Sequence, residues 1–398
     1  MKEFTGFTFY MYTDMVFGKG TEARVANLIA KHGGTRVLFL YGEGSIKRSG
    51  LYDTVVNALD AGGIPFAELG GIQPNPLRSR VDEGYKLAVD SGADFVLAVG
   101  GGSVIDTAKG VALALANEGD YWQFYNRVPP ERMAPVGTIH TIAASGSETS
   151  RSSVLVDDGP PRRKKSLLYE PCRPVFAIMD PELTYSVSAY QTGVGAADIF
   201  AHTVSRYFTA PSSALGDEYC EGTFRTVVKY GPIAIERPHD YEARAELMLA
   251  GAFSHNDLTG IGRDGPRGGE HGLESQISAY YNTAHGAGLA VIMPAWLQYI
   301  ADHGDAAQVA RVARFGVKVF GVDADLSDVR ATACEGLARF RTWLKSLGMP
   351  LTLSELGVPK PDLDSVVQRC LDNWGGGPVP GYMPLGADAV RAIFESAL

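Results

Sequence analysis

Cysteines and long apolar runs are scarce in this sequence, and each scarcity excludes a class of protein. Only four residues are cysteines, and no two of them form a CxxC pair: Cys172, Cys220, Cys334 and Cys370. Cysteines so widely spaced predict reduced, buried thiols of a cytoplasmic protein. They argue against a disulfide framework and against a thiolate zinc site.

Membrane-spanning and secretory segments are not expected either. No window reaches the length of apolar sequence that a membrane helix needs, and the N-terminal stretch MKEFTGFTFYMYTD lacks the apolar core of a signal peptide. Runs of one charge are also missing, since the longest basic cluster is RRKK at 162–165 and the formal net charge is -9. This balance argues against a nucleic-acid partner.

What the first half does contain is an alternation of short apolar runs and longer amphipathic segments. Residues 35–45, TRVLFLYGEGS, and 94–103, DFVLAVGGGS, are strand-like runs that end in glycine. Helical spacing of apolar residues follows them, in LYDTVVNALDAGG and VIDTAKGVALALAN. The alternation predicts an α/β fold with a parallel sheet, and the uninterrupted apolar strands predict that both faces of the sheet are covered.

Beyond residue 187 the pattern changes to successive long amphipathic segments with few β-branched runs. Examples are AYQTGVGAADIFAHTVSRYF, YEARAELMLAGAFSHND and LSDVRATACEGLARFRTWLKSLG. We therefore predict two domains: an α/β domain with a parallel sheet over 1–187 and an all-α domain over 188–398.

Two stretches of the first half are candidates for a phosphate or cofactor site. Gly101, Gly102 and Ser103 lie between an apolar strand and a helix, where glycine lets a ligand approach the backbone and the helix N-terminus offers free N–H groups. The turn matches neither GxGxxG nor GxxxxGK[ST], so a tight turn without a ligand is an open alternative. The hydroxyl-rich stretch 138–150, TIHTIAASGSETS, is either the wall of a cofactor groove or a simple loop.

Histidine is rare as well, with eight in the chain, yet His271 and His285 lie close together in the sequence. Asp198 and His202 are spaced by one helical turn, so on a helix they share one face. A hydrogen bond on that face would explain this pair alone. Together the four residues supply one carboxylate and three imidazoles, a set that suits Zn²⁺ or Fe²⁺ and leaves room for a substrate oxygen. The sequence therefore predicts a site for one divalent ion.

The order of several motifs is distinctive. GGGSVIDTAKG is followed by SGSETS, then by D-x3-H at 198–202 and H-x13-H at 271–285, with FGKG, QPNP, FAIMDP and YNTAHGAGLAVIMPAW around them. Over essentially its whole length the chain resembles the iron-containing (metal-dependent) alcohol dehydrogenases, in particular their butanol-dehydrogenase-like branch. The resemblance implies an N-terminal dinucleotide-binding domain, a helical metal-binding domain and a cleft between them.

The same resemblance implies roles for individual residues. Gly101, Gly102 and Ser103 would hold the pyrophosphate of the dinucleotide. The residues implied to line the cofactor groove are Thr141, Ser145, Ser147, Ser150 and Met179, with Lys164 beside the nicotinamide ribose. The implied metal ligands are Asp198, His202, His271 and His285.

One position departs from the family pattern. Members commonly carry H-x3-H, and the second histidine faces the substrate, whereas in this chain Ser275 stands four residues after His271. A proton relay would therefore run through Ser275, water or another group. Ser275 and Lys164 are the candidate catalytic side chains.

These features predict a metal-dependent alcohol dehydrogenase that reduces a short-chain aldehyde with NAD(H). Glu43, at the end of the first long strand, could accept hydrogen bonds from an adenosine ribose and would repel a 2′-phosphate, although Lys47 and Arg48 lie nearby. Arg263 and Arg267 suit an anionic substrate such as sulfoacetaldehyde or a semialdehyde. If they belong to a solvated loop, a neutral aldehyde such as butanal is the alternative.

Other functions remain open at this stage. They are NADP(H)-linked butanol dehydrogenation, a polyol dehydrogenase, a lyase of the dehydroquinate-synthase kind, and a nucleotide- or metal-binding protein without activity. We further expect a cytoplasmic homo-oligomer, such as a dimer, that acts on small molecules.

Overall fold

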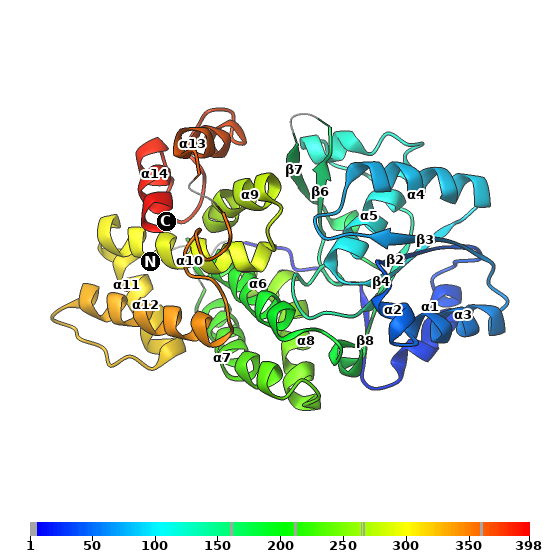
Figure 1. Ribbon diagram of the computed structural model, residues 1–398, viewed down its shortest axis with the longest axis horizontal. Coiled ribbons are helices and arrows are strands. Elements are labelled where there is room, and N and C mark those ends of the chain that lie inside the picture. The colour runs from blue at the N-terminus through cyan, green and yellow to red at the C-terminus, as the bar shows by residue number, and fades with distance from the viewer. Residues whose placement is uncertain (1–5, 160–161, 211–212, 264, 266, 359–360) are drawn as a thin grey trace. The chain divides into compact units, whose positions relative to one another are not determined.

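The computed structural model describes residues 6–159, 162–210, 213–263, 265, 267–358 and 361–398. These residues form two compact units (Figure 1). One unit, here the sheet unit, consists of Tyr10–Val187 and Pro238–Asn256. The other, the helical unit, contains Ser188–Arg237, Asp257–Leu398 and the described residues before Tyr10. A stretch from the second half of the chain therefore belongs to the sheet unit.

The sheet unit is built on six parallel strands in the order β1-β8-β5-β4-β2-β3. The strands are β1 (Asp14–Phe17), β2 (Val37–Gly42), β3 (Phe66–Ile72), β4 (Phe95–Gly100), β5 (Val136–His140) and β8 (Phe176–Met179). A separate antiparallel pair consists of β6 (Ser152–Asp157) and β7 (Arg163–Leu168). The predicted parallel sheet is confirmed.

Both faces of the sheet are covered by helices, as the uninterrupted apolar strands predict. Side chains of β2 alternate, so that Leu38 packs into a core with α4 (Arg78–Ser91) and α5 (Gly102–Ala116), while Phe39 packs into a second core on the opposite face. The helices of the second face are α1 (Val25–Lys31), α2 (Ser45–Arg48) and α3 (Leu51–Ala61). Figure 1 shows the two helical layers on either side of the strands.

One helix from later in the chain completes the sheet unit. Met248 and Ala252 of α8 (Tyr241–His255) form a small apolar cluster with Ala177 and Met179 of β8. The Thr149 hydroxyl donates a hydrogen bond of 2.9 Å to the Ala252 carbonyl. This helix therefore shares a core with the end of the sheet.

The helical unit has an aromatic core in which Phe200 stacks on Phe340 with ring centroids 5.0 Å apart. Its helices are α6 (Ala189–Tyr207), α7 (Ala214–Glu236), α9 (Gly269–Tyr281), α10 (His285–His303), α11 (Ala306–Phe320), α12 (Val329–Ser346), α13 (Leu363–Asp372) and α14 (Ala387–Ser396). This unit also contains the 3₁₀ helix η5 (Leu258–Gly260), whereas the sheet unit contains η1 (Thr21–Arg24), η2 (Trp122–Asn126), η3 (Glu170–Cys172) and η4 (Pro181–Thr184). None of the helices formed by the described residues could cross a membrane.

The cysteines agree with the prediction in one respect and differ in another. All four thiols are free, and Cys172, Cys220 and Cys370 are buried. Cys334 is half-buried, and its sulfur accepts a contact of 3.8 Å from the side-chain amide of Gln298.

Candidate functional site

The helical unit brings together the side chains of three predicted metal ligands. Asp198 and His202 lie one turn apart on α6, where both are buried, and His271 comes from the first turn of α9. One potential ligand atom from each residue lies within 4.8 Å of those of the other two. The His202 and His271 rings stack with centroids 4.8 Å apart. Because one turn of α6 faces the start of α9, the spacing in the sequence becomes a cluster in space.

His285 lies beside this cluster as the first residue of α10. Its ring centroid is 5.4 Å from that of His271. Gly286 follows directly, and a Cβ atom at Gly286 would lie 2.1 Å from the carbonyl oxygen of Val194 on α6. The missing side chain thus lets the start of α10 pack against α6, and this packing holds His285 near the other three residues.

The donor set fits a divalent metal ion. The Nε2 atom of His271 is buried and has no hydrogen-bond partner among the described residues, so its lone pair is available to an ion. One carboxylate and three imidazoles match the ligands that Zn²⁺ and Fe²⁺ prefer. The geometry supports a metal centre made by Asp198, His202, His271 and His285.

Three further residues surround these ligands and escaped the sequence analysis. Glu270 accepts a hydrogen bond at 2.9 Å from Nδ1 of His271, and the Ser205 hydroxyl contacts both groups. Glu274 accepts a hydrogen bond from Nδ1 of His285. The available signal was the segment EHGLE at 270–274, in which two carboxylates one turn apart flank a ligand histidine.

In the sheet unit, the strand order predicts a ligand-binding site at the carboxyl ends of β2 and β4. From β2 the chain continues to β3 on one side and then returns to β4 on the other, so connections run in opposite directions from this point. Ligands of open α/β sheets bind where the strand order reverses in this way. The glycine turn, formed by Gly101, Gly102 and Ser103, follows β4 directly. Glu43 is exposed immediately after β2.

The glycine turn is closely covered by the segment that follows β5. A Cβ atom at Gly101 would lie 2.5 Å from Ile142, and one at Gly102 would lie 2.4 Å from the Ser145 hydroxyl. Gly101 is the N-cap of α5, so the free N–H groups of the helix start here. The buried Ser145 hydroxyl has no hydrogen-bond partner among the described residues. Free amides, a free hydroxyl and missing side chains suit a pyrophosphate group.

The remaining predicted cofactor residues differ in their exposure. Thr141 and Ser103 are half-buried, whereas Ser147, Ser150 and Met179 are buried. Ser147 donates a hydrogen bond of 2.6 Å to Asp106, and the Ser150 carbonyl accepts one of 2.9 Å from Lys109. A direct role of these three in cofactor binding stays a prediction.

Lys109 is a buried cation that holds the segment after the Ser145 loop. Its ammonium group donates to the carbonyl oxygens of Ser147, Ser150 and Ser152 at 2.8, 2.9 and 2.6 Å. Burial lowers the pKa of Lys109 to about 8, although the charge of Asp106 opposes this shift. Burial likewise raises the pKa of Asp106. The pair was not identified in the sequence, because nothing in GGGSVIDTAKG distinguishes a buried lysine from an exposed one.

The two candidate catalytic side chains lie in different units. Lys164 is half-buried on β7, opposite Val156, and its charge acts on Asp106. Ser275, on α9, donates a hydrogen bond of 3.0 Å to the Gly272 carbonyl of its own helix. That bond occupies the proton of the Ser275 hydroxyl, so its role in proton transfer stays a prediction.

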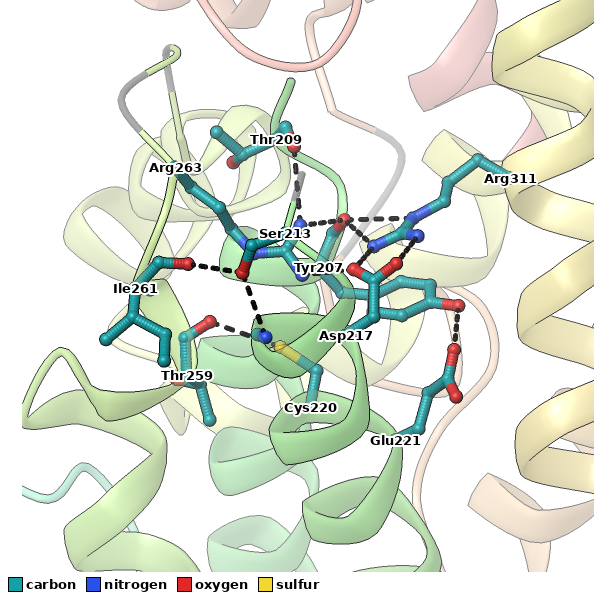
Figure 2. A network of polar contacts seen from close by, with 12 residues as sticks. Tyr207, Thr209, Ser213, Asp217, Cys220, Glu221, Thr259, Ile261, Arg263 and Arg311 are labelled. Carbon is teal, nitrogen blue, oxygen red and sulfur yellow. Dashed lines mark hydrogen bonds and ion pairs between the residues drawn. The ribbon is translucent and has the colours of Figure 1, made fainter. Parts of the chain in front are cut away.

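Arg263 and Arg267 contact protein acceptors in the segment that leads to α9. Arg263 is buried, pairs with Asp217 and donates to the Tyr207 carbonyl at 3.3 Å (Figure 2). Arg267 donates to the carbonyl oxygens of Gly260 and Arg263 at 3.3 and 3.1 Å. These contacts give both arginines a structural role, and the substrate class proposed below follows from them.

Figure 2 shows that Arg263 belongs to a network between α7, α11 and the segment before α9. Arg311 forms two hydrogen bonds with the Asp217 carboxylate, of 2.5 and 2.7 Å. Burial opposes the ionisation of Asp217, but the hydrogen bonds and charges of Arg311 and Arg263 outweigh it and lower its pKa. The network is therefore a set of ionised groups that anchors the approach to His271.

Comparison with known proteins covers both halves of the chain. Residues 13–181 match the family "Iron-containing alcohol dehydrogenase", and residues 191–398 match "Fe-containing alcohol dehydrogenase family, C-terminal". NADH-dependent butanol dehydrogenase A of Clostridium acetobutylicum is 35% identical over 98% of this chain and 99% of its own. NADPH-dependent aldehyde reductase of Escherichia coli is 31% identical over the same shares.

A solved structure agrees with these matches. NADH-dependent butanol dehydrogenase A from Thermotoga maritima superposes with a TM-score of 0.93 at 35% identity, covering 99% of each chain. The two family matches together span most of the chain. The relatives above 30% identity and the shared fold agree with them. The chain belongs to the iron-containing alcohol dehydrogenase family, in its butanol-dehydrogenase-like branch, and is an oxidoreductase of the alcohol dehydrogenase and aldehyde reductase type.

Proposed function

We propose that this enzyme reduces a short aliphatic aldehyde with NADH, at one divalent ion held by Asp198, His202, His271 and His285. The observation that carries the proposal is the cluster of three buried or half-buried ligand side chains in the helical unit, with His285 beside it. When bound, the ion supplies a Lewis acid for the carbonyl oxygen, and the nicotinamide supplies the hydride.

The side chains and backbone of this chain supply binding and orientation. The imidazoles of His271 and His285 are held by the carboxylates of Glu270 and Glu274, which fixes how the rings present their other nitrogen atoms. In the sheet unit, the N-terminus of α5 offers its amides and Ser145 its hydroxyl to a pyrophosphate. Ser275 donates its proton within α9, so water is the simpler source of the proton that the product alcohol gains.

The preference for NADH rests on Glu43. This exposed carboxylate follows β2 at the point where the strand order reverses, and a carboxylate there accepts hydrogen bonds from a ribose and repels a 2′-phosphate. Lys47 lies over the rings of Tyr41 and Tyr52, 4.9 and 4.5 Å from their centroids, so its charge already has aromatic partners. Relatives whose names specify NADH support the same preference.

A neutral substrate follows from the contacts of the two arginines. An anionic aldehyde needs a free cation near the metal, and the guanidinium groups of Arg263 and Arg267 donate to Asp217 and to backbone carbonyls. We therefore expect butanal to be reduced at least as efficiently as sulfoacetaldehyde or succinic semialdehyde.

The test is a kinetic comparison of these three aldehydes with NADH and with NADPH, after loading the enzyme with Fe²⁺ or Zn²⁺. We expect NADH to be favoured, butanal to be a substrate, and Glu43→Gln to raise kcat/KM with NADPH by about tenfold, which corresponds to about 1.4 kcal/mol. The His271→Ala variant should have no measurable turnover in any combination.

Two results would overturn parts of this proposal separately. A preference of tenfold or more for an anionic aldehyde, lost in Arg267→Ala, would restore the anionic substrate class. Full activity of His271→Ala, or of metal-free enzyme saturated with NADH, would reject the metal centre itself.

A further inference from the structure

Glu270 and Glu274 lie one turn apart on α9, and both side chains have no exposed surface. Each accepts a hydrogen bond from Nδ1 of a different predicted ligand, His271 and His285. Fully buried carboxylates are rare unless they are paired or hydrogen-bonded. Their placement directly behind two ligands of one candidate metal centre therefore calls for a function.

The chemistry of this contact is specific. An ionised carboxylate has only acceptors, so the histidine Nδ1 must carry the proton and Nε2 keeps its lone pair. A carboxylate behind a ligand histidine also fixes the orientation of the ring and raises the basicity of the ligand. Two such contacts, one for His271 and one for His285, orient half of the proposed ligand set.

We propose that Glu270 and Glu274 are positioning residues that set the affinity of the site for a divalent cation, an inference that rests on the proposed function above. Neither carboxylate belongs to the proposed ligand set. Each acts through its histidine, by holding the ring and by placing a negative charge behind it.

The protein holds both carboxylates in place. The Ser205 hydroxyl of α6 donates to Glu270 and lies 3.1 Å from Nδ1 of His271. On α10, Gly288 leaves space for Glu274, because a Cβ atom at Gly288 would lie 2.4 Å from the Oε1 atom of Glu274. A serine that contacts one carboxylate and a glycine that makes room for the other indicate a built arrangement.

A buried arginine accompanies these acids. Arg206 follows Ser205 on α6 and donates a hydrogen bond of 2.9 Å to the His202 carbonyl. Burial lowers the pKa of Arg206 to about 10, and Asp257 and Glu270 are among the acids whose charges oppose that shift. A buried guanidinium therefore lies close enough to Glu270 for their charges to interact.

The experiment measures the affinity of the metal-free, full-length protein for Zn²⁺ by competition with a chelating dye. Glu270→Gln and Glu274→Gln keep the shape of the side chain and an acceptor but remove the charge. We expect each to weaken Zn²⁺ binding by about 10- to 100-fold, and to shift the absorption bands of the Co²⁺-loaded protein. The matched control is Glu221→Gln, because Glu221 is equally buried in the same unit but bonds to Tyr207 and Arg314.

A second variant tests position without changing charge. Gly288→Ala should displace the Glu274 carboxylate and weaken Zn²⁺ binding in the same direction as Glu274→Gln. Unchanged affinity in both glutamine variants, or equal weakening in Glu221→Gln, would overturn the inference alone. If the wild type bound Zn²⁺ no better than His271→Ala, the proposed metal centre would fail, and this inference with it.

Discussion

Both units contain a buried cation that holds a loop beside a candidate site, but the two cations are stabilised differently. In the sheet unit, Lys109 donates to three carbonyl oxygens, and burial dominates, so its pKa falls to about 8 while that of Asp106 rises. In the helical unit, burial again opposes the charge, but Arg263 and Arg311 flank Asp217, and their hydrogen bonds and charges together outweigh burial, so the pKa of Asp217 falls.

The difference shows what each loop depends on. The segment after Ser145 depends on one ammonium group whose charge is costly to bury. The segment before α9 depends on a carboxylate shared by two guanidinium groups. Removal of the cationic side chain should therefore be felt most in the sheet unit, and the two units should respond to opposite ends of the pH range.

The largest effect is expected for Lys109→Met. The substitution leaves the carbonyl oxygens of Ser150 and Ser152 and the Asp106 carboxylate without their buried cation, which places the loss of unfolding free energy toward the upper end of about 3–5 kcal/mol. Urea unfolding at pH 7 measures it.

The pH dependence sharpens this prediction. Because the folded pKa of Lys109 lies near 8 and the unfolded value near about 10.4, the unfolded state binds more protons between these limits. Wild-type stability should thus rise with pH across this window relative to the Met variant. A falling difference would contradict the assignment of Lys109 as a cation held against burial.

A smaller loss is expected for Asp217→Asn, toward the lower end of about 3–5 kcal/mol. The new amide keeps one acceptor oxygen but carries no charge, so Arg263 and Arg311 lose the carboxylate that pairs with both. The folded pKa of Asp217 is lowered, so its contribution is present above the unfolded value and is lost as the pH falls through the folded one. Unfolding midpoints of variant and wild type should converge below about pH 4.

The control for this prediction is Asp364→Asn. Asp364 pairs with Arg391 in the same unit, but its side chain is 84% exposed. Exposed ion pairs contribute little, so the midpoint should not change. An equal loss of stability in both variants would mean that burial does not increase the contribution of the Asp217 ion pairs to the free energy of unfolding.

The smallest effect is steric and concerns the glycine turn. In Gly102→Ala the new methyl group would collide with the Ser145 hydroxyl, so we expect KM for NADH to rise about tenfold, or about 1.4 kcal/mol. Adding Ser145→Ala removes the atom in the way and should recover most of the affinity. If the double variant binds NADH no better than Gly102→Ala, the collision with the Ser145 hydroxyl is not the cause of the weaker NADH binding.

The sequence predicted those parts of the protein in which spacing alone determines geometry. Asp198 and His202 share a helix face because four residues complete about one turn, and the apolar strands around Phe39 alternate into two cores. The positions of the later ligands became predictable through the family pattern. These features depend on local periodicity, or on motifs whose order along the chain is typical of the family.

The missed contacts join distant segments. The pairing of Arg263 could not be predicted, because its partner Asp217 comes from α7, far earlier in the chain. Glu270 and Glu274 are adjacent to the ligands in sequence, but only the packing of α9 against α6 and α10 shows that they are fully buried. Burial, which decides whether a charge is structural or available, is set by tertiary contacts.

The membership of α8 in the sheet unit has a consequence for dividing this protein. Both family matches are contiguous stretches of sequence, yet the sheet unit is assembled from Tyr10–Val187 and Pro238–Asn256. A single cut near residue 187 would give one fragment whose Met179 lacks Met248, and another that carries α8 without its apolar partners. The two halves therefore cannot be exchanged between relatives at one crossover point without parting a shared core.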